Sequence, residues 1–416
     1  MLKSLHLKHV GLASELHVDW AERINLIVGD NGLGKSFLLD VAWWALTRTW
    51  AGPVAMPAPG RHKPSIEYVV QGKTKTAVPV VSDFRRTDAS WPLGQARPAM
   101  PGIVIYLRID GGFSVWDPAR NYWRTDPGRP AAYHFQSAQV WDGLDDSHGV
   151  RVCEGLERDW VSWQEGRKPQ FAALEAVLAV LSPPGEPLQP GPPQRVFLGE
   201  GRDRPTLQIG SHCVPVALAS AGVRRMLALA YFLVWAWHEH RMAAKLLGKH
   251  PENRVVILFD EPETHLHPRW QRTVLPSLLA AVQALHGKQG KPPHTQLLAA
   301  THSPLVAASL EPSFDAQQDD LIHLTLHQGQ VHVEQGGWAT QGDVTNWLVS
   351  EAFGLEQARS IEAEHAIEAA EALMRGETSR DPTLNTLAAI HARLQQLLPA
   401  GDPFWPRWLV QTGSLA

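Results

Sequence analysis

Several short runs in this 416-residue sequence combine residue types that can hold phosphate groups. The first, Gly29-Asp-Asn-Gly-Leu-Gly34-Lys35-Ser36, satisfies the pattern G-x-x-x-x-G-K-[ST]. Its glycines let backbone N–H groups curl around phosphates, the lysine can reach the β and γ phosphates, and the serine can ligate Mg²⁺. An ordinary glycine-rich turn is the alternative. The predicted nucleotide contacts are Gly29, Asp30, Asn31, Gly32, Leu33, Gly34, Lys35, Ser36 and Phe37.

Two adjacent carboxylates follow an apolar run further along the chain. Residues 255–259 read Val-Val-Ile-Leu-Phe and precede Asp260, Glu261 and Pro262. A buried parallel strand would place both acids at its carboxyl end, where α/β sheets bind ligands. Asp260 is predicted to hold Mg²⁺ through water, and Glu261 to orient or deprotonate an attacking water. The alternative is a strand that ends in two solvated acids.

A histidine occupies the corresponding position after a second apolar run. Gln296-Leu-Leu-Ala-Ala is followed by Thr301-His302-Ser303-Pro304. Because an imidazole can donate and accept, His302 could hydrogen-bond the γ phosphate or the attacking water. The chain has 20 histidines, so a histidine without a catalytic role is the alternative. Its position at the end of a strand favours catalysis.

A candidate anion site precedes the strand that carries the two acids. Leu218-Ala-Ser220-Ala221-Gly222 stands at the start of a long apolar-rich segment. Ser220 is a suitable helix N-cap, and an exposed helix N-terminus beside Gly222 can bind an anion. The alternative is that Ser220 only caps the helix.

The spacing of apolar residues predicts the elements that position these side chains. Strands are expected over 2–7, 16–18 and 24–28, and a helix over 35–48 follows the glycine-rich loop. The proline-rich stretches 51–64 and 183–193 are expected to be loops. The remaining expected elements are hairpins of 66–70 with 77–81 and of 322–326 with 330–334, strands over 103–109, 255–259 and 296–300, and helices over 171–181, 221–247 and 270–285.

This order of elements predicts an α/β fold with a mixed sheet, a mainly helical inserted lobe and a helical C-terminal tail. An N-terminal lobe over residues 1–136 would carry the glycine-rich loop. An inserted lobe of helices and loops is expected over 137–212, and a C-terminal lobe with the other motifs over 213–335. The tail, 336–416, is expected to form a partner or self-assembly surface.

In this order, the four motifs resemble those of the ABC-type ATPases of the RecF, SMC and OLD group, often labelled AAA-15 or AAA-21 ATPases. The resemblance covers residues 1–335, and Glu263-Thr-His-Leu-His-Pro268 is similar to a run common in OLD-like and Septu-like anti-phage defence ATPases. It implies an ABC-type P-loop NTPase head with ATP and Mg²⁺ as cofactors. It also implies that the motifs are Walker A (29–36), the signature (220–225), Walker B (260–261) and the switch histidine, His302.

In this group of ATPases, two heads enclose ATP between them. The resemblance therefore implies a dimer or higher oligomer in which Ser220 and Gly222 of one copy complete the site of the other. Val223 stands where the signature usually has Glu or Gln, which puts that contact in doubt. A glutamine that senses Mg²⁺ usually precedes the signature helix, and Gln136 is the candidate, with an ordinary surface amide as the alternative. The histidines His265 and His267 are expected to pack or cap rather than bind metal.

The composition excludes several other function classes. Lys and Arg number 38 against 42 Asp and Glu, so the net charge of −4 provides no chain-wide basic field for DNA. Cys153 and Cys213 form no CxxC pair, which argues against a disulfide framework or a zinc knuckle. The start lacks an apolar signal core, and no apolar stretch reaches the roughly 18 residues of a membrane helix. A cytoplasmic protein without membrane contact is expected.

The resemblance leaves the partner open. The sequence has no sustained heptads and no Asp-x-Asp after His302, so neither the coiled coil of SMC proteins nor the nuclease domain of OLD proteins is expected. We therefore expect an ATPase that regulates a separate nuclease or toxin in bacterial anti-phage defence. One alternative is a RecF-like DNA repair ATPase, and another is an ATP-gated scaffold with negligible turnover. The candidate DNA contacts are Arg85, Arg86, Arg224, Arg225 and residues 245–254.

The chain has 17 tryptophans but only 5 tyrosines. Trp43, Trp44, Trp235 and Trp237 lie on expected helices beside the motifs, where core packing is the expectation. Because buried aromatic anchors dominate protein interfaces, the other tryptophans predict partner surfaces in the insertion and tail. These are Trp116, Trp123, Trp141, Trp160, Trp163, Trp338, Trp347, Trp405 and Trp408.

Overall fold

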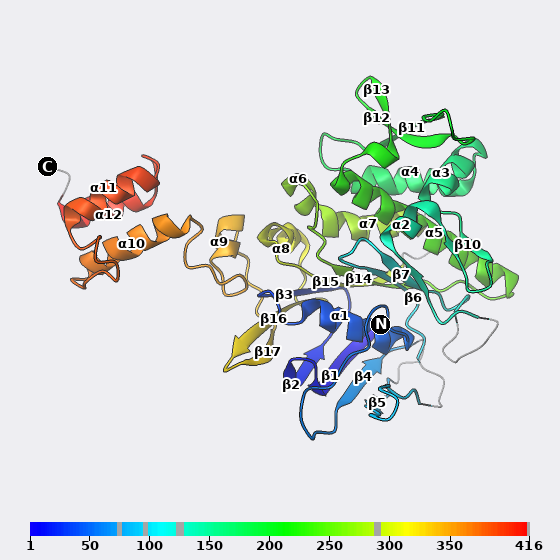
Figure 1. Cartoon of the computed structure of the whole chain (residues 1–416), viewed down its shortest axis with the longest axis horizontal. Coiled ribbons are helices and arrows are strands. Elements are labelled where there is room, and N and C mark those ends of the chain that lie inside the picture. The colour runs from blue at the N-terminus through cyan, green and yellow to red at the C-terminus, as the bar shows by residue number, and fades with distance from the viewer. Residues whose placement is uncertain (73–76, 95–98, 122–128, 287–292, 414–416) are drawn as a thin grey trace. The chain divides into compact units, whose positions relative to one another are not determined.

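The computed structural model describes residues 1–72, 77–94, 99–121, 129–286 and 293–413. Trp123 lies outside these ranges. The chain separates into two compact units, Met1–Gly342 and Asp343–Ala416 (Figure 1). The larger unit contains every predicted site residue.

An eight-stranded mixed sheet, counted over the described residues, forms the centre of the larger unit, with strand order β17-β16-β3-β15-β14-β6-β7-β8. Its central strands are parallel, so their carboxyl ends meet at one edge. They are apolar along their length because helices or a second sheet cover both faces. The predicted α/β fold with a mixed sheet is confirmed. The strands are β3 (Ile24–Gly29), β6 (Ile103–Leu107), β7 (Phe113–Trp116), β8 (Tyr133–Phe135), β14 (Arg254–Asp260), β15 (His294–Ala300), β16 (Asp319–His327) and β17 (Gln330–Gln335).

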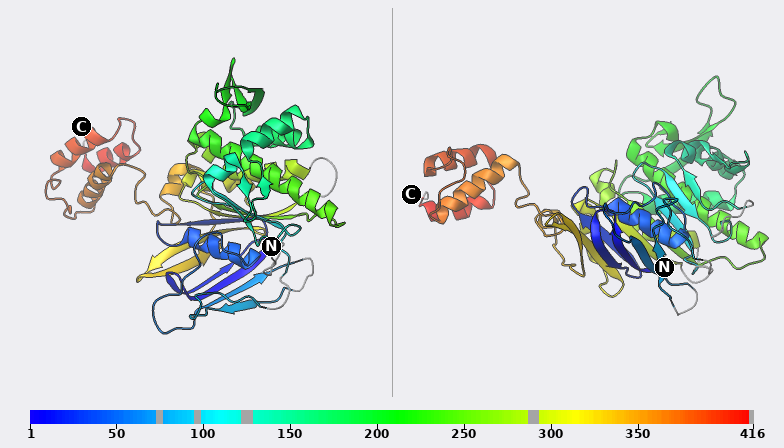
Figure 2. Two further views of the ribbon diagram at one scale, coloured as in Figure 1. Left: turned by 45° about the vertical axis from the view of Figure 1, so that its right-hand side comes forward. Right: turned by 60° about the horizontal axis from the view of Figure 1, so that its bottom comes forward.

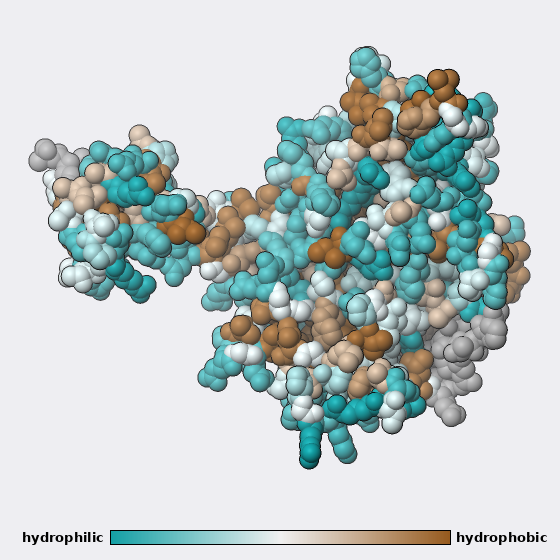
Figure 3. Space-filling view, in the orientation of Figure 1, coloured by the Kyte–Doolittle hydropathy of each residue, from teal (hydrophilic) through white to brown (hydrophobic). Residues whose placement is uncertain are grey.

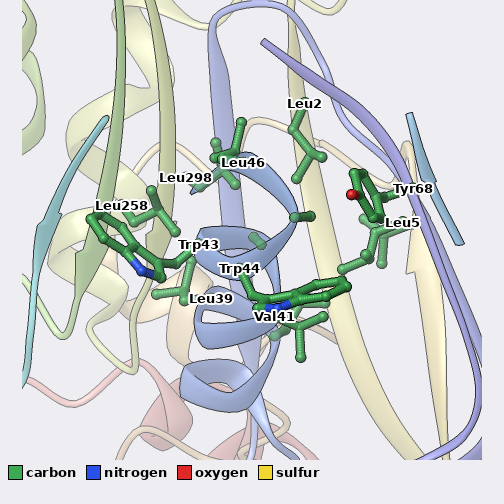
Figure 4. Close-up of a cluster of buried hydrophobic side chains, with 14 of the residues drawn as sticks. Leu2, Leu5, Leu39, Val41, Trp43, Trp44, Leu46, Tyr68, Leu258 and Leu298 are labelled. Carbon is green, nitrogen blue, oxygen red and sulfur yellow. The ribbon is translucent and has the colours of Figure 1, made fainter. Parts of the chain in front are cut away.

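A second, antiparallel sheet, in the order β2-β1-β4-β5, lies on one side of α1 (Lys35–Thr47). Figure 4 shows Trp43 of this helix beside Leu258 of the large sheet, whereas Trp44 points towards Tyr68 of the small sheet. Both tryptophans are buried, as expected, because the helix has a sheet on either side. This packing fixes the helix that follows the glycine-rich loop. The strands of the small sheet are β1 (Leu2–Val10), β2 (Ala13–Asp19), β4 (Ser65–Val70) and β5 (Val80–Asp83).

Two long helices, α5 (Ala221–Leu246) and α7 (Val274–His286), pack against the opposite face of the large sheet. The continuous apolar run from Met226 to Trp237 is buried. The sequence predicted one helix over 270–285, but α6 (Pro268–Gln271) ends before α7 begins. Pro276 explains the break, because it lacks an N–H for the carbonyl of Arg272 and its ring clashes with that carbonyl. The short α8 (Pro304–Leu310) and η2 (Glu311–Ser313) follow β15.

The inserted lobe contains more strand structure than the sequence predicted. The proline-rich stretch 183–193 was expected to be a loop, but Gln189–Gln194 forms β11. Among the described residues this strand pairs with β12 alone, at the edge of a three-stranded sheet, where proline is tolerated because no ladder N–H is needed. Figure 2 shows this sheet at the far end of the lobe from the small sheet, and Figure 3 shows hydrophobic residues on the surface there. The lobe and its junction with α5 comprise α2 (Ser137–Asp142), β9 (Leu144–Asp145), β10 (Arg151–Cys153), α3 (Leu156–Glu165), α4 (Pro169–Leu181), β11, β12 (Arg204–Ile209), β13 (His212–Pro215) and η1 (Val216–Leu218).

The smaller unit consists of helices with their own apolar core. Trp408 is 0% exposed at the centre of this core, and Trp405 packs against it while donating its indole N–H to Pro399 O at 2.8 Å. Trp347 is also buried. The helices are α9 (Val344–Leu348), α10 (Ile361–Met374), α11 (Leu387–Leu397) and α12 (Phe404–Thr412).

The prediction that the tryptophans of the insertion and tail mark partner surfaces is therefore wrong for most of them. Small lobes must bury large apolar side chains to form a core at all, and tryptophan supplies the most apolar surface per residue. Trp141 and Trp338 remain partly exposed, and Trp338 stacks on Phe314 at 3.8 Å. The buried ones are Trp116, Trp160, Trp163, Trp347 and Trp408.

None of the helices in the described ranges has both the length and the apolar character needed to cross a membrane. Cys153 is buried and Cys213 partly exposed, and both are free thiols.

Candidate functional site

The glycine-rich loop connects β3 to α1 at the edge of the sheet where the parallel strands end. Gly34 caps α1 with φ +93°, a left-handed conformation that favours glycine. Lys35 is 4% exposed, and its ammonium donates to Gly29 O at 2.7 Å and to Asp30 O at 3.0 Å. Burial lowers the pKa of Lys35, against the opposing effect of the nearby acids. The loop therefore encloses a desolvated cation.

The other predicted loop residues divide into two groups. Asp30, Asn31 and Gly32 are exposed. Leu33 and Phe37 instead pack into the core formed with the small sheet. Their side chains hold the loop to the fold, so only their backbone N–H groups could face a phosphate.

Ser36 and Asp260 meet although 224 residues separate them along the sequence. The Ser36 hydroxyl donates to Asp260 Oδ1 at 3.0 Å, which joins the first turn of α1 to the end of β14. Asp260 is 1% exposed, and burial raises its pKa. A hydroxyl and a carboxylate are oxygen ligands of the kind that Mg²⁺ prefers, so this pair fits a Mg²⁺ site.

His302 connects Lys35 with Glu261. The Lys35 ammonium lies 3.3 Å from His302 Nδ1, and His302 Nε2 lies 3.1 Å from Glu261 Oε1. Because an ammonium can only donate, Nδ1 accepts, so Nε2 carries the proton and donates to the carboxylate. Burial and the lysine charge lower the pKa of His302, which favours this neutral imidazole.

Glu261 lies at a sharp turn directly after β14. Its φ is +47°, and its N–H donates to Ala300 O at 2.9 Å, which ties the turn to β15. Burial raises the pKa of Glu261 to about 8, and the hydrogen bond to Glu263 and the charges of Glu263 and Asp260 act in the same direction. A carboxyl group with a raised pKa in a partly buried site is typical of general acid–base groups.

Sequence reasoning gave Glu263 no role, although it lies in the run similar to OLD-like proteins. Its Oε2 accepts from Thr301 Oγ1 and its Oε1 from the His302 N–H, both at 2.7 Å. The only sequence signal was an acid three residues after Asp260. That signal does not reveal a contact with a strand end 38 residues away.

The signature segment packs against the turn that follows β14. Ser220 caps α5 by accepting from Val223 N at 3.4 Å, and its side chain is exposed. Arg225 donates to Asp260 O at 3.2 Å and to Glu261 O at 3.0 Å, and burial lowers the pKa of its guanidinium. A Cβ on Gly222 would lie 2.6 Å from His265 O, so no larger residue fits there.

Of the two histidines beside Walker B, His267 has the expected capping role. His267 caps α6 by accepting from Arg269 N at 3.3 Å. His265 is exposed and has φ +64° in the turn against Gly222.

The structure does not bring Gln136 together with Ser36 and Asp260. Gln136 follows β8, and the strands β6 and β7 lie between β8 and β14. At about 4.8 Å per strand, this separates β8 from β14 by about 14 Å. The exposed side chain instead forms a capping box at the start of α2. At the end of β6, the strand beside β14, the chain has Arg108 paired with Asp110 at 3.0 Å.

The C-terminal lobe matches a known family model. Residues 210–308 match the model described as "AAA domain, putative AbiEii toxin, Type IV TA system". The matched segment contains the signature segment, both Walker B acids and His302. The match is confined to this part of the chain.

Several solved structures are similar to the chain at low sequence identity. The SMC head domain from Thermotoga maritima is 16% identical with a TM-score of 0.39, over 80% of this chain and 98% of that one. An SMC head bound to the C-terminal winged-helix domain of ScpA is 14% identical with a TM-score of 0.42, over 80% and 97% of the two chains. The recombination mediator protein RecF is 12% identical with a TM-score of 0.38, over 80% and 98%.

Proposed function

We propose that this protein binds ATP with Mg²⁺ at the carboxyl edge of the large sheet and hydrolyses it to ADP and phosphate. The observation that carries this proposal is the convergence of five side chains in two adjacent sets of contacts: His302 lies 3.3 Å from Lys35 and 3.1 Å from Glu261, and Ser36 lies 3.0 Å from Asp260. Lys35 and Ser36 begin α1, Asp260 and Glu261 lie at the end of β14, and His302 follows β15. Each has the chemistry that phosphoryl transfer requires at its position.

Each residue has a separate role in this proposal. Lys35 exchanges its loop carbonyls for the β and γ phosphates, and Ser36 and Asp260 hold Mg²⁺, which neutralises phosphate charge when bound. Glu261 orients the attacking water and accepts its proton. His302, with a proton on Nε2, donates to the γ phosphate or to the water.

The proposal includes a second copy of the chain. Ser220 is exposed at the N-terminus of a 26-residue helix, and Gly222 keeps that end of the helix against the Walker B turn. A helix N-terminus of this length attracts phosphate. We propose that ATP joins two copies, with Ser220 and Gly222 of one facing the nucleotide of the other.

We also propose that ATP turnover regulates a separate nuclease or toxin in bacterial anti-phage defence, in the cytoplasm. The family model matched by residues 210–308 carries the name of a putative toxin of a type IV toxin–antitoxin system, which supports a role in a system of two proteins that act together. Copurification of the tagged, natively expressed protein with a nuclease or toxin would support this part. Reproducible purification of the protein without such a component would contradict it.

The test of the ATPase proposal compares binding and turnover in matched variants. Labelled ATP binding and phosphate release are measured with Mg²⁺ for wild type, Lys35→Ala and Glu261→Gln. We expect Lys35→Ala to lose binding and Glu261→Gln to keep binding while phosphate release falls about 10²-fold or more. Lys249→Ala and Glu175→Gln are the controls, because both side chains are exposed away from the site.

The alternatives give different results in the same assays. Equal, near-zero phosphate release by wild type and Glu261→Gln, with ATP binding and dimerisation intact, would support an ATP-gated scaffold. Salt-dependent DNA binding would support a RecF-like repair protein. Two of the candidate DNA contacts are already paired with acids, Arg85 with Asp88 at 3.2 Å and Arg254 with Glu252 at 3.3 Å, so we do not favour this alternative.

A further inference from the structure

Glu263 joins the Walker B turn to the segment that carries His302. Both of its carboxylate oxygens are used, one by the Thr301 hydroxyl and the other by the His302 N–H, each at 2.7 Å. Thr301 is fully buried, and its hydroxyl oxygen also accepts from Ser303 N at 3.0 Å. The carboxylate therefore holds the backbone from which the His302 ring projects.

The position of that backbone decides what the imidazole can reach. The His302 side chain is 34% exposed, yet its Nε2 lies 3.1 Å from Glu261 Oε1. On the C-terminal side the segment is fixed by Ser303, which caps α8 by accepting from Val306 N at 3.3 Å. On the other side it continues from β15. Glu263 supplies the side-chain contact to His302 and the residue before it.

We infer that Glu263 is a positioning residue for ATP hydrolysis: it holds the His302 backbone where the imidazole reaches both Glu261 and the γ phosphate. This inference rests on the proposed ATPase function. Both oxygens of Glu263 accept from the His302 segment, and the Glu261 carboxyl also hydrogen-bonds to Glu263, so the residue acts through these neighbouring side chains rather than on the nucleotide. Its loss should therefore affect turnover more than binding.

The first experiment separates turnover from binding. In Glu263→Ala, we expect kcat for phosphate release to fall about 10- to 100-fold, because a displaced catalytic group loses most of its effect. KM and labelled-ATP affinity should stay within about twofold of wild type. Glu175→Ala, an exposed glutamate on α4, is the matched control.

Conservative variants test the hydrogen bonds themselves. In Glu263→Gln, the amide oxygen can accept the His302 N–H and the amide N–H can donate to the Thr301 hydroxyl, so kcat should recover to within about threefold of wild type. Thr301→Ser keeps the hydroxyl and should also retain activity. Thr301→Val removes it and should lower kcat, although by less than Glu263→Ala.

A double-mutant cycle with His302→Ala distinguishes positioning from general damage. If Glu263 acts through His302, Glu263→Ala should lower kcat by less than about twofold in the His302→Ala background. The inference would be overturned if Glu263→Ala lowered kcat in the His302→Ala background as much as it does in wild type. It would also be overturned if Glu263→Ala alone left kcat unchanged or lowered ATP affinity as much as kcat.

Hydrogen exchange tests the contact without any turnover. The His302 amide should exchange slowly in wild type and Glu263→Gln, and faster in Glu263→Ala at unchanged global stability. If wild type shows no phosphate release, the ATPase proposal fails, while the exchange rates still decide whether Glu263 holds this backbone. Equal exchange in all three proteins would overturn the positioning role even if ATP is hydrolysed.

Discussion

At the scale of single residues, the candidate site is a set of charges removed from water and paired with one another. Lys35 and Asp260 are nearly fully buried. This burial lowers the pKa of Lys35 and raises the pKa of Asp260, and both shifts favour the neutral form of the group. The cost of burying each charge is offset by the neighbouring charge and by hydrogen bonds. Removal of one charged side chain therefore leaves its neighbour as a buried charge without compensation.

Gly222 should not accept a side chain. In Gly222→Ala, the added Cβ would meet His265 O at 2.6 Å, so the start of α5 must move away from the Walker B turn. We expect a loss of about 1–3 kcal/mol in the free energy of unfolding and a lower kcat, measured by urea denaturation and phosphate release. Gly52→Ala is the control, because a Cβ added to Gly52 would have no atom within 4 Å. A Gly222→Ala protein as stable and active as wild type would contradict this account.

A half-buried carboxyl in the inserted lobe gives a pH-dependent prediction. Tyr231 donates to Asp159 Oδ2 at 2.6 Å, and burial raises the pKa of Asp159 from 3.8 to about 6. Between these values the folded protein binds more protons than the unfolded chain, so this group lowers stability as the pH rises from about 4 to about 6.

We therefore expect Asp159→Asn to gain stability relative to wild type as the pH rises from 4 to 8. The amide keeps an acceptor for Tyr231 and carries no charge to bury. The difference in melting temperature between Asp159→Asn and wild type, measured across this pH range, would show the gain, with exposed Asp142→Asn as the control. A difference in melting temperature that stays constant or shrinks with rising pH would contradict the raised pKa of Asp159.

At the scale of elements, the structure explains which parts of the sequence were informative. The apolar runs 255–259 and 296–300 predicted β14 and β15 because buried parallel strands need continuous apolar residues. Strands β7 and β8 were missed because three or four residues give too short a pattern. Gln136 was chosen from its place in the sequence. Which strand lies beside β14 depends on long-range pairing that no local pattern encodes.

Trp408 should be essential to the smaller unit. It is completely buried among α10, α11 and α12, so Trp408→Ala leaves a large cavity and costs about 3–5 kcal/mol. We expect this unit to lose its protection from limited proteolysis while the larger unit still binds ATP. Trp405→Ala, at a partly exposed position, should have a smaller effect. Loss of ATP binding in Trp408→Ala would show that the two units do not fold separately.

At the scale of the whole molecule, the chain consists of two units with separate cores. The motifs and their order predicted the larger unit well, because each motif is local and carries its own chemistry. The partner or self-assembly surface expected over residues 336–416 stays a prediction, because helices rich in Ala and Glu carry no chemical signature that identifies a partner. The buried tryptophans Trp347 and Trp408 supply apolar core rather than surface.

The larger unit should function without the tail. A protein comprising residues 1–342 contains the complete candidate site and both sheets. We expect it to fold and to bind ATP with an affinity within about threefold of the full chain, measured with labelled nucleotide. The same truncated protein with Lys35→Ala is the control. A failure of residues 1–342 to bind ATP when the full chain does would show that the tail contributes to the site.

The place of β3 in the large sheet also has a consequence for biosynthesis. This strand leads into the glycine-rich loop, yet its two neighbours, β15 and β16, are made from residue 294 onwards. At 5–20 residues per second, a ribosome needs on the order of 15–60 s to synthesise the chain between β3 and β16. The glycine-rich loop is thus among the first parts of this protein to be translated and among the last to gain its final neighbours. During that interval, the apolar strand before it needs shielding from other nascent chains.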